Sequence, residues 1–463
     1  MKLSVRNLLA IVAAIGFAPL PSFAQDAVPS QYGCSQYEFG TSLPAVEGKD
    51  GVFYRTFADL RMQHPMDNRV VAQMERLAKA LKAQGTTLVF AGIPPKSLAM
   101  PELLPERAAD YGFERDVAEA VYTDIIDRLS ARGILAPDIM TALRKPTGSD
   151  ERPLFGSDFH WTSAGARLAA QAIGAMIKAD PRYNDLTHRS YETRETGVMS
   201  SFSSMRLALQ AFCVDALPPV ETMTYETVEV AGNNTVLDIG LDTPEATDAA
   251  DGTVDIFGES AAKAPDIVLV GTSFSDSNVN NFAGFLQEYT GLEVVNYAIT
   301  GGNQFGSMTS YLSSREFRDA RPKYLIWESP IYNNLALYGP APMEELIFLA
   351  DSDCDPALST TTGADNALEA TFDGAGPGPK DVVYIDFGGE GPRHINVTLT
   401  SQSGLRRESR MGRDDRLRAT GRFVLWLQPY WSPDISTISV KFDRPLGQKA
   451  SLSVCHNPKG NDL

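Results

Sequence analysis

An acidic residue and a histidine stand two positions apart in the segment FGSDFHWTSAGA, residues 155–166, as Asp158 and His160. The chain holds only five histidines. A histidine works as a general base when a carboxylate holds its ring in one tautomer and its other nitrogen reaches a hydroxyl. The alternative is a turn-capping aspartate beside a surface imidazole, and the residue types alone leave both interpretations open.

A hydroxyl that can serve as the nucleophile appears in the segment IVLVGTSFSD, residues 267–276. Its apolar start predicts a buried strand that ends at Gly271, with Ser273 in the turn into the next helix. Open α/β sheets carry their active sites at the carboxyl ends of the strands, where backbone N–H groups can stabilise an oxyanion. Ser273 is therefore the candidate nucleophile, although a simple helix cap is the alternative.

A glycine-rich turn in NYAITGGNQFGSM, residues 296–308, also follows a predicted strand and precedes a helix. If its strand neighbours that of Ser273, Gly302 and Asn303 lie beside the serine turn, and the Asn303 amide can donate to an oxyanion. A phosphate-binding loop is the competing interpretation. It is disfavoured because the Walker lysine and the complete G-x-G-x-x-G spacing are both missing.

The predicted elements place these residues on an α/β framework. Residues 162–179 form a helix capped by Thr162 or Ser163, which holds the Asp-His loop, and it is expected to bury Leu168, Ala172, Ile173 and Met176. Periodicity predicts a second helix that buries Val117, Val121, Ile125 and Leu129. Further helices are expected at 66–84, 279–289 and 305–318, and strands at 86–93, 134–139, 266–271, 293–298 and 323–329.

Two other regions differ in composition from this framework. Residues 214–262 hold eleven acids and no Lys or Arg, and alternation in MTYETVEV predicts a small acidic β insertion. Beyond residue 350 the alternating segments DVVYIDF, HINVTLT, RFVLWLQ and TISVKF predict a β-sandwich. We therefore expect two domains, at 25–350 and 351–463.

The N-terminus predicts export. A basic start, an apolar run and the small-x-small ending Ser22-Phe23-Ala24 are typical of a signal peptide at residues 1–24. Its removal takes Lys2 and Arg6 and changes the formal charge from −17 to −19, which disfavours nucleic acid as a partner. The four cysteines suit disulfides in an oxidising compartment, with three pairings open. No C-x-x-C or H-x-x-x-H spacing supports a metal site, and no cofactor is expected.

One basic island, residues 404–422, holds seven arginines and three acids. Arg406 and Arg410 can meet the carboxylates of a polyuronate through bidentate hydrogen bonds, or the island can be a solvated hairpin. Nearby, Trp426 and Trp431 can contribute to a sugar-binding surface, or can be core residues. The acidic remainder of the chain would repel a polyanion.

The motifs in combination resemble the periplasmic alginate O-acetyltransferase family (AlgX and AlgJ). They are D-x-H-W-T-x-x-G-A at 158–166, V-G-T-S-F-S at 270–275, the glycine-rich turn, and PKYLIWESP at 322–330, with IPPKSLAMPELLP at 93–105 also fitting. The resemblance implies an SGNH-hydrolase-like parallel sheet whose Asp-His motif is circularly permuted ahead of the serine. It also implies a C-terminal β-sandwich similar to a carbohydrate-binding module.

Carried onto this chain, the resemblance implies Asp158 as the residue that orients the imidazole, His160 as the base and Ser273 as the nucleophile. It implies the disulfides Cys34–Cys213 and Cys354–Cys455. The ordinary SGNH block has G-D-S, whereas this chain has Gly271-Thr272-Ser273.

The implied activity is transfer of an acetyl group, through a serine acyl-enzyme, to hydroxyls of an exported polysaccharide such as alginate. The acetyl donor would be supplied by a membrane O-acyltransferase or another periplasmic partner, alongside further export and assembly proteins. A carbohydrate acetylesterase and a non-catalytic polysaccharide-binding protein are the alternatives.

Overall fold

The computed structural model describes residues 30–64, 66–230, 264–351, 354, 360–363, 367–372, 376–447 and 449–455. The predicted signal peptide and residues 231–262 of the predicted acidic insertion lie outside the described residues. No helix in the described ranges combines the length and the hydropathy that crossing a membrane requires.

A four-stranded parallel sheet forms the centre of the α/β domain, in the order β3-β8-β6-β7. The strands are β3 (Thr87–Ile93), β6 (Ile267–Val270), β7 (Val294–Asn296) and β8 (Tyr324–Pro330). All residues of β3, β6 and β8 are buried, which explains their unbroken apolar runs. Strand β6, which leads into the turn that carries Ser273, is therefore flanked by β7 and β8.

One predicted strand is wrong. Residues 134–139 contribute only an isolated parallel bridge between Leu135 and Val89. The chain turns away at Pro137, and α5 (Ile139–Leu143) begins two residues later with Asp138 as its N-cap. Proline has no N–H to donate to a sheet, so the ladder cannot continue there.

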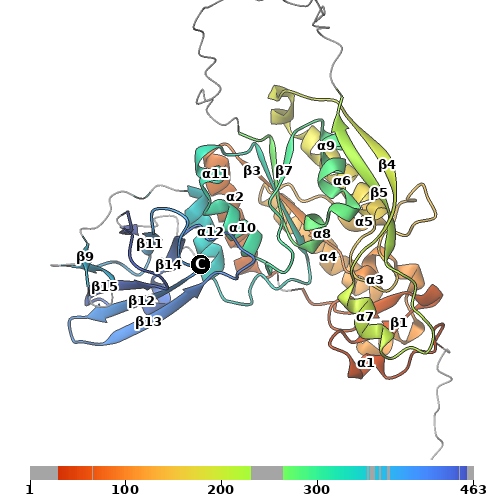
Figure 1. Ribbon diagram of the computed structural model, residues 1–463, viewed down its shortest axis with the longest axis horizontal. Coiled ribbons are helices and arrows are strands. Elements are labelled where there is room, and N and C mark those ends of the chain that lie inside the picture. The colour runs from red at the N-terminus through yellow and green to blue at the C-terminus, as the bar shows by residue number, and fades with distance from the viewer. Residues whose placement is uncertain are drawn as a thin grey trace, which may run out of the picture.

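Helices cover both faces of the sheet (Figure 1). The helices α2, α10, α11 and α12 lie on the side that faces the C-terminal domain, and α6 and α9 lie on the opposite side. The bounds of these helices and of α4 are α2 (Asn68–Ala83), α4 (Arg115–Ala131), α6 (Ser163–Ala179), α9 (Phe282–Thr290), α10 (Gly306–Leu312), α11 (Arg315–Asp319) and α12 (Ala341–Asp351).

Three helix predictions need correction. Helix α4 buries Tyr122, whose hydroxyl donates to the carbonyl of Gly92 at the end of β3, and it leaves Val117 43% exposed. The predicted helix 279–289 is interrupted at Asn281, whose φ of 51° is left-handed. The predicted helix 305–318 divides at Ser314, which caps α11 by accepting from the Phe317 N–H.

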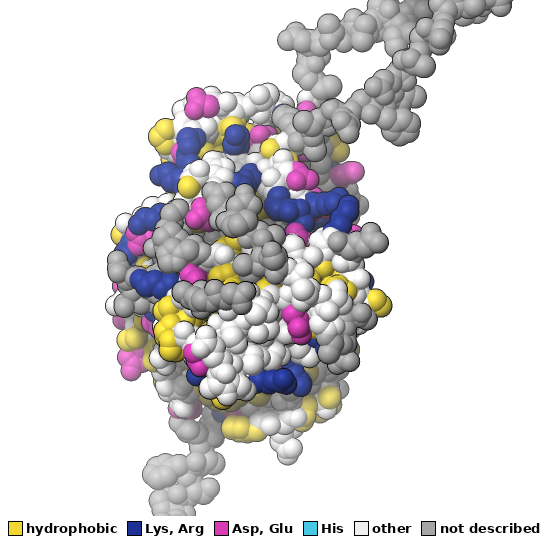
Figure 2. Space-filling model, turned by 90° about the vertical axis from the view of Figure 1, so that its left-hand side faces the viewer, with side chains coloured by type: hydrophobic (Ala, Val, Ile, Leu, Met, Phe, Trp, Pro, Cys, Tyr) yellow, Lys and Arg dark blue, Asp and Glu magenta, His cyan; other side chains and the backbone are white. Residues whose placement is uncertain are grey.

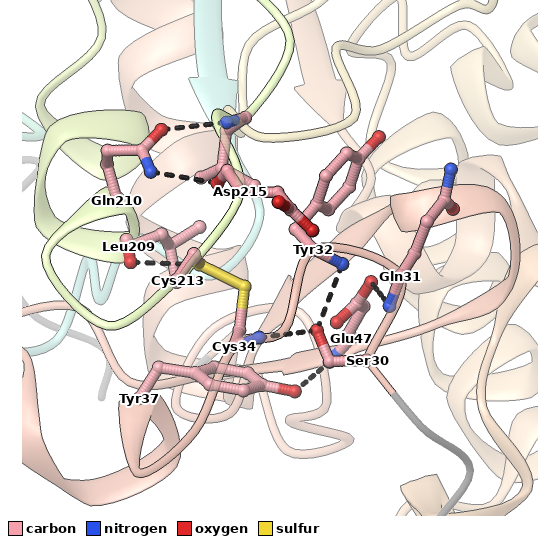
Figure 3. Close-up of a disulfide and its surroundings, with 11 residues drawn as sticks. Ser30, Gln31, Tyr32, Cys34, Tyr37, Glu47, Leu209, Gln210, Cys213 and Asp215 are labelled. Atoms are coloured by element: carbon pink, nitrogen blue, oxygen red, sulfur yellow. Dashed lines mark hydrogen bonds between the residues drawn. A yellow bond between two sulfur atoms is a disulfide. The ribbon is translucent and has the colours of Figure 1, made fainter.

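A small layer, formed by N-terminal residues and α7, packs against the α/β domain. It comprises α1 (Tyr37–Gly40), the antiparallel strands β1 (Ala45–Glu47) and β2 (Phe53–Arg55), and α7 (Ser204–Gln210). The disulfide Cys34–Cys213 joins its two distant segments (Figure 3). Asp215 reinforces the same connection, because its backbone N–H donates to the carbonyl of Tyr32 at 3.0 Å.

The acidic segment begins as half of a β ribbon. Strand β5 (Glu221–Glu229) pairs antiparallel with β4 (Tyr191–Ser200). The sequence predicted β5 but not its partner. Most β4 side chains are exposed, so its residues lack the apolar alternation that marks a half-buried strand.

The C-terminal domain is the predicted β-sandwich. One sheet has the order β13-β12-β15-β10-β9 and the other β14-β11-β16, and every pairing is antiparallel. The strands are β9 (Thr361–Thr362), β10 (Leu368–Thr371), β11 (Val382–Asp386), β12 (His394–Ser401), β13 (Arg406–Gly412), β14 (Arg422–Trp426), β15 (Ile435–Phe442) and β16 (Ser451–Cys455).

The sandwich is attached to the α/β domain by covalent and packing contacts. The disulfide Cys354–Cys455 connects β16 to the segment that follows α12, as the resemblance implied. Residues Val382, Val424 and Trp426 pack into the same apolar core as the α/β domain. The two domains therefore share a buried surface.

Candidate active site

The structure brings Asp158, His160 and Ser273 into one hydrogen-bonded sequence. Asp158 Oδ1 lies 2.6 Å from His160 Nδ1, and His160 Nε2 lies 2.7 Å from Ser273 Oγ. The backbone N–H of His160 also donates to Asp158 Oδ1 at 2.8 Å. Ser273 is 113 positions from His160, so the arrangement depends on the fold and not on local sequence.

Aromatic contacts hold the histidine loop against the serine turn. The indole N–H of Trp161 donates to the carbonyl of Phe274 at 2.8 Å, which joins the two segments directly. The rings of Phe159 and Phe274 lie 4.1 Å and 4.8 Å from the imidazole ring, centre to centre. These contacts limit ring rotation, while a quarter of the His160 side chain, 24%, stays exposed for a substrate.

Thr162 anchors the loop to α6, as the sequence predicted. Its hydroxyl accepts from the Gly165 N–H and donates to the carbonyl of Arg152. Gly165 lies against the backbone of Pro153, where an added Cβ would collide with the Pro153 carbonyl. The G-A ending of D-x-H-W-T-x-x-G-A therefore has a packing reason.

Asp158 is buried and held from both sides. Its Oδ2 accepts from the hydroxyl of Ser203 at 2.6 Å, while its Oδ1 serves His160. Burial alone would raise the pKa of Asp158, but the hydrogen bonds and charge of His160, together with the Ser203 hydroxyl, bring that pKa down to about 2. The carboxylate is therefore charged at neutral pH.

Ser203 was missed in the sequence analysis. It is the N-cap of α7 and accepts from the Arg206 N–H, and that local pattern is the only signal it carries. Its contact with Asp158 spans 45 positions of the chain. The cap is recognisable from sequence, whereas the partner of its hydroxyl depends on where α7 packs.

A second buried charged group supports the loop from below. Lys96, at the start of α3 (Lys96–Ala99), donates from Nζ to the carbonyls of Phe53 at 2.9 Å and Gly156 at 3.1 Å. Burial lowers its pKa to about 8. Lys96 belongs to the IPPKSLAMPELLP segment and ties it to the Asp158 loop.

Arg55 and Asp59 form a buried ion pair next to this lysine. Two guanidinium nitrogens of Arg55 bind both carboxylate oxygens of Asp59, each at 3.0 Å. The guanidinium carbon also lies 4.2 Å from the ring centre of Phe159. The ion pair therefore braces the residue that precedes His160.

Glu328, on β8, is a further missed residue. It is fully buried, and its carboxylate accepts from the Thr272 N–H at 2.7 Å and from the Ser275 hydroxyl at 3.0 Å. Burial raises its pKa to about 7 in spite of these bonds. The motif PKYLIWESP carried this residue in the sequence, but nothing there showed that it faces the serine turn.

The glycine-rich turn lies beside the serine turn, as predicted from neighbouring strands. The Thr300 N–H donates to Asp276 Oδ2 at 2.8 Å, at the end of α8 (Ser273–Asp276). Asn303 adopts a left-handed φ of 56°, and its side-chain oxygen accepts from the Phe305 N–H. The oxyanion role of Gly302 and Asn303 stays a prediction.

The sugar-binding role predicted for Trp426 is wrong. Its side chain is only 6% exposed and packs in the core shared by the two domains. Trp431 is half-buried, and its indole N–H donates to the carbonyl of Pro377 at 2.7 Å. Binding by Trp431 stays a prediction, because the residue is only half-buried.

The basic island has two unlike parts. Arg406 and Arg410 are exposed on β13, an edge strand of the sandwich. Farther along, Arg413 pairs with Glu345, Arg418 with Glu316 and Arg422 with Asp386, and the first two of these pairs cross between the domains.

The surface of the C-terminal domain shows no single basic patch in the view of Figure 2. Lys and Arg side chains lie there in several small groups among acidic, apolar and neutral ones. Binding of a polyuronate by Arg406 and Arg410 stays a prediction. Among the described residues, His, Cys, Asp and Glu side chains form no group of three that could hold a metal ion.

The family model described as "SGNH hydrolase-like domain, acetyltransferase AlgX" matches residues 45–331. The alginate biosynthesis protein AlgX of Pseudomonas fluorescens is 29% identical over 396 residues, which cover 83% of this chain and 76% of that protein. The probable alginate O-acetylase AlgJ of Pseudomonas aeruginosa is 30% identical over 308 residues, covering 65% and 71%.

A solved structure described as "Structural and functional characterization of Pseudomonas aeruginosa AlgX" superposes with a TM-score of 0.72 at 23% sequence identity. The superposition covers 92% of this chain and 97% of the other, so the two-domain fold is shared along nearly its whole length. The matched range contains Asp158, His160, Ser273 and Glu328. The chain belongs to the AlgX family of SGNH hydrolase-like acetyltransferase domains.

Proposed function

We propose that this chain is a polysaccharide O-acetyltransferase that carries the acetyl group on Ser273. The observation that supports it most directly is the continuous hydrogen bonding from Asp158 through His160 to Ser273. The names of the relatives, which include an alginate O-acetylase, agree with this chemistry. In this proposal Asp158 orients the imidazole, His160 is the general base and Ser273 is the nucleophile.

The first half-reaction forms the acyl-enzyme. Nε2 of His160 takes the Ser273 proton as Oγ attacks the acetyl carbonyl, and the resulting imidazolium then protonates the leaving group of the donor. Asp158 stabilises the imidazolium, because its low pKa keeps it charged while the positive charge develops. His160 then takes the proton of the sugar hydroxyl that attacks the acyl-enzyme, and it returns that proton to Ser273 Oγ as the bond between Oγ and the acetyl group breaks.

Transfer rather than hydrolysis requires an acceptor that is held better than water, and orientation of an acceptor can contribute about 7–11 kcal/mol. A cavity of about 670 Å³ lies where α11 meets the C-terminal domain, and its lining includes Arg315, Arg393, Arg418 and Arg422. The loop before β14 lines this cavity through Arg418. The same loop reaches the glycine-rich turn, where Arg416 donates to the Gly301 carbonyl at 3.5 Å. The exposed Arg315 and Arg416 along this path suit the carboxylates of a polyuronate, whereas Arg418 and Arg422 are already paired with Glu316 and Asp386.

We propose alginate or a similar polyuronate as the acceptor. The acetyl donor would come from a membrane O-acyltransferase or a periplasmic partner, in company with other polysaccharide export proteins. The two disulfides suit the periplasm, which the predicted signal peptide at residues 1–24 would give access to.

Hydrolysis is the second candidate, because the same three side chains would also serve an SGNH-type carbohydrate acetylesterase. The experiment incubates the protein and its Ser273→Ala variant with an activated acetyl ester, with and without oligouronates, and follows acetate and acetylated oligosaccharide by mass spectrometry. Acetyl on the sugar supports the transferase, and free acetate alone supports the esterase. Equal activity of Ser273→Ala would exclude this serine, and the exposed Ser130→Ala on α4 is the matched control.

A further inference from the structure

Glu328 differs from three other buried carboxylates of the α/β domain, each of which has an arginine partner. Glu344 pairs with Arg76, Glu345 with Arg413 and Asp59 with Arg55. Within the described part of the chain, no Lys or Arg side chain forms an ion pair with Glu328. A buried carboxylate without a cation is unfavourable, so its retention at the nucleophile turn points to a role there.

Its hydrogen bonds enclose Ser273 from both sides. Before the serine, Glu328 accepts from the backbone N–H of Thr272 at 2.7 Å and from the Thr272 hydroxyl at 3.1 Å. After the serine, it accepts from the Ser275 hydroxyl at 3.0 Å. Both groups are on the turn that carries the nucleophile.

These bonds also give three neighbouring hydroxyl groups different partners. Thr272, Ser273 and Ser275 lie within four residues, and each carries a hydroxyl. Glu328 takes up those of Thr272 and Ser275, whereas that of Ser273 lies 2.7 Å from His160 Nε2. The carboxylate therefore leaves the middle hydroxyl for the base.

Close packing links Glu328 to the G-T-S motif. A Cβ added to Gly271 would lie 2.5 Å from Glu328 Oε2 and 2.9 Å from its Cβ, closer than real Cβ contacts. Gly271 has no left-handed φ that would otherwise explain the glycine. The glycine of V-G-T-S is thus required by the glutamate of W-E-S on the neighbouring strand.

We propose that Glu328 is the positioning residue of the nucleophile turn: it holds Thr272 and Ser275 so that Ser273 Oγ is presented to His160. It acts through the turn and touches neither His160 nor the acetyl group. This inference rests on the proposed function, because it takes Ser273 as the nucleophile.

The test compares Glu328→Gln, which keeps one acceptor oxygen, with Glu328→Met, which keeps the volume and no oxygen. Glu344→Gln on α12 is the matched control, since it neutralises a buried glutamate of the same domain away from the serine. Each protein is assayed for turnover of p-nitrophenyl acetate and for the rate at which phenylmethylsulfonyl fluoride labels Ser273. Near-ultraviolet circular dichroism reports the folded fraction.

For the glutamine variant we expect kcat and the labelling rate to fall about 10-fold, and for the methionine variant about 100-fold, since hydrogen bonds to a charged group are lost in steps. KM should stay within about twofold in both, because the acetyl-binding surface is intact. The control should lose thermal stability and keep kcat, because it breaks the pair with Arg76.

Wild-type rates in both Glu328 variants would overturn the inference and leave Ser273 as the nucleophile. Absence of labelling at Ser273 in the wild-type protein would instead overturn the proposed function. If Glu328→Met does not fold, Glu328→Gln decides. A fall in kcat at constant KM and constant folded fraction supports positioning, and an unchanged kcat refutes it.

Discussion

The buried network around the active site and the basic island, residues 404–422, are both polar, but their side chains are held in different ways. At the active site, Asp158, Lys96 and Glu328 are almost wholly buried and each has at least two hydrogen-bonding partners. On β13, Arg406 and Arg410 are exposed to solvent. Buried polar groups must be satisfied in one geometry, whereas exposed ones are satisfied by water in many.

This difference shows which parts of the fold fix the positions of the active-site side chains. Glu328 on β8 reaches the turn that carries Ser273 after β6 because the strand ends of a parallel sheet lie at one edge. The α7 cap and the Lys96 segment then fix the Asp158 loop from outside the sheet. Arg406 and Arg410 of the island offer charge without a comparable restraint, which suits contact with a mobile polymer.

The largest expected effect is the loss of the base. We expect His160→Ala to lower acetyl transfer by about 10⁴-fold or more, since triad members act as a unit. Because the variant also removes a hydrogen-bonding partner of the buried Asp158 carboxylate, the free energy of unfolding should fall as well. Product mass spectrometry and urea denaturation measure the two quantities, and near-normal transfer would remove His160 from the mechanism.

The next prediction divides the island itself. Arg413 and Glu345 side chains are 11% and 8% exposed, so Arg413→Ala should cost about 3 kcal/mol or more by leaving a buried carboxylate unpaired. Arg406→Ala should change stability by no more than about 0.5 kcal/mol. Urea denaturation of both variants measures this, and equal losses would show that the two parts of the island do not differ.

The pH dependence of stability tests whether burial raises the pKa of Glu328. Its pKa rises from 4.5 to about 7 on folding, so the folded state binds the extra proton between these values. The stabilising contribution of that proton is complete below pH 4.5 and is lost as the pH rises through about 7. The free energy of unfolding of Glu328→Gln, taken relative to that of wild type, should therefore rise by up to about 3 kcal/mol between pH 4.5 and pH 8.

The measurement is urea unfolding of wild type and Glu328→Gln at several pH values in this window. Glu344→Gln is the control, with the same chemical change at an arginine-paired site. A stability difference that stays constant with pH would contradict a raised pKa for Glu328.

The smallest expected effect concerns Ser203. Removal of its hydroxyl in Ser203→Ala should lower kcat about 10-fold, because Asp158 loses one of its hydrogen bonds, and should cost about 1 kcal/mol as a lost helix cap. Ser204→Ala, one residue further into α7, is the matched control. Steady-state kinetics separates them, and identical kcat values would limit Ser203 to a capping role.

The candidate site was predictable in part because its residues lie in strongly marked local contexts. An apolar run that ends in G-T-S marks a strand and its turn, and D-x-H followed by T-S-A-G-A marks a loop before a helix. Ser203 and Glu328 lack such marks. A cap serine and a glutamate at a strand end occur in many roles, and theirs is set by neighbours 45 and 53–56 positions away.

The same limit explains the errors elsewhere. Trp426 has the residue type of a sugar platform, but it packs inside because β14 is covered by α12 and the rest of the α/β domain. Val117 has the right spacing for a buried face, but α4 packs with Tyr122 toward Gly92 and leaves Val117 at the surface. Periodicity shows that one side of an element is buried, and not which neighbour buries it.

By itself the sequence determined most of the helices and strands, the sandwich, and the residue types proposed for the triad, because hydrophobic spacing and capping are local properties. Only the tertiary structure decided which hydroxyl meets the histidine and which carboxylates hold the two catalytic segments in place. The physical reason is that hydrogen bonds act over about 3 Å, so their partners are settled only after distant strands and helices have packed.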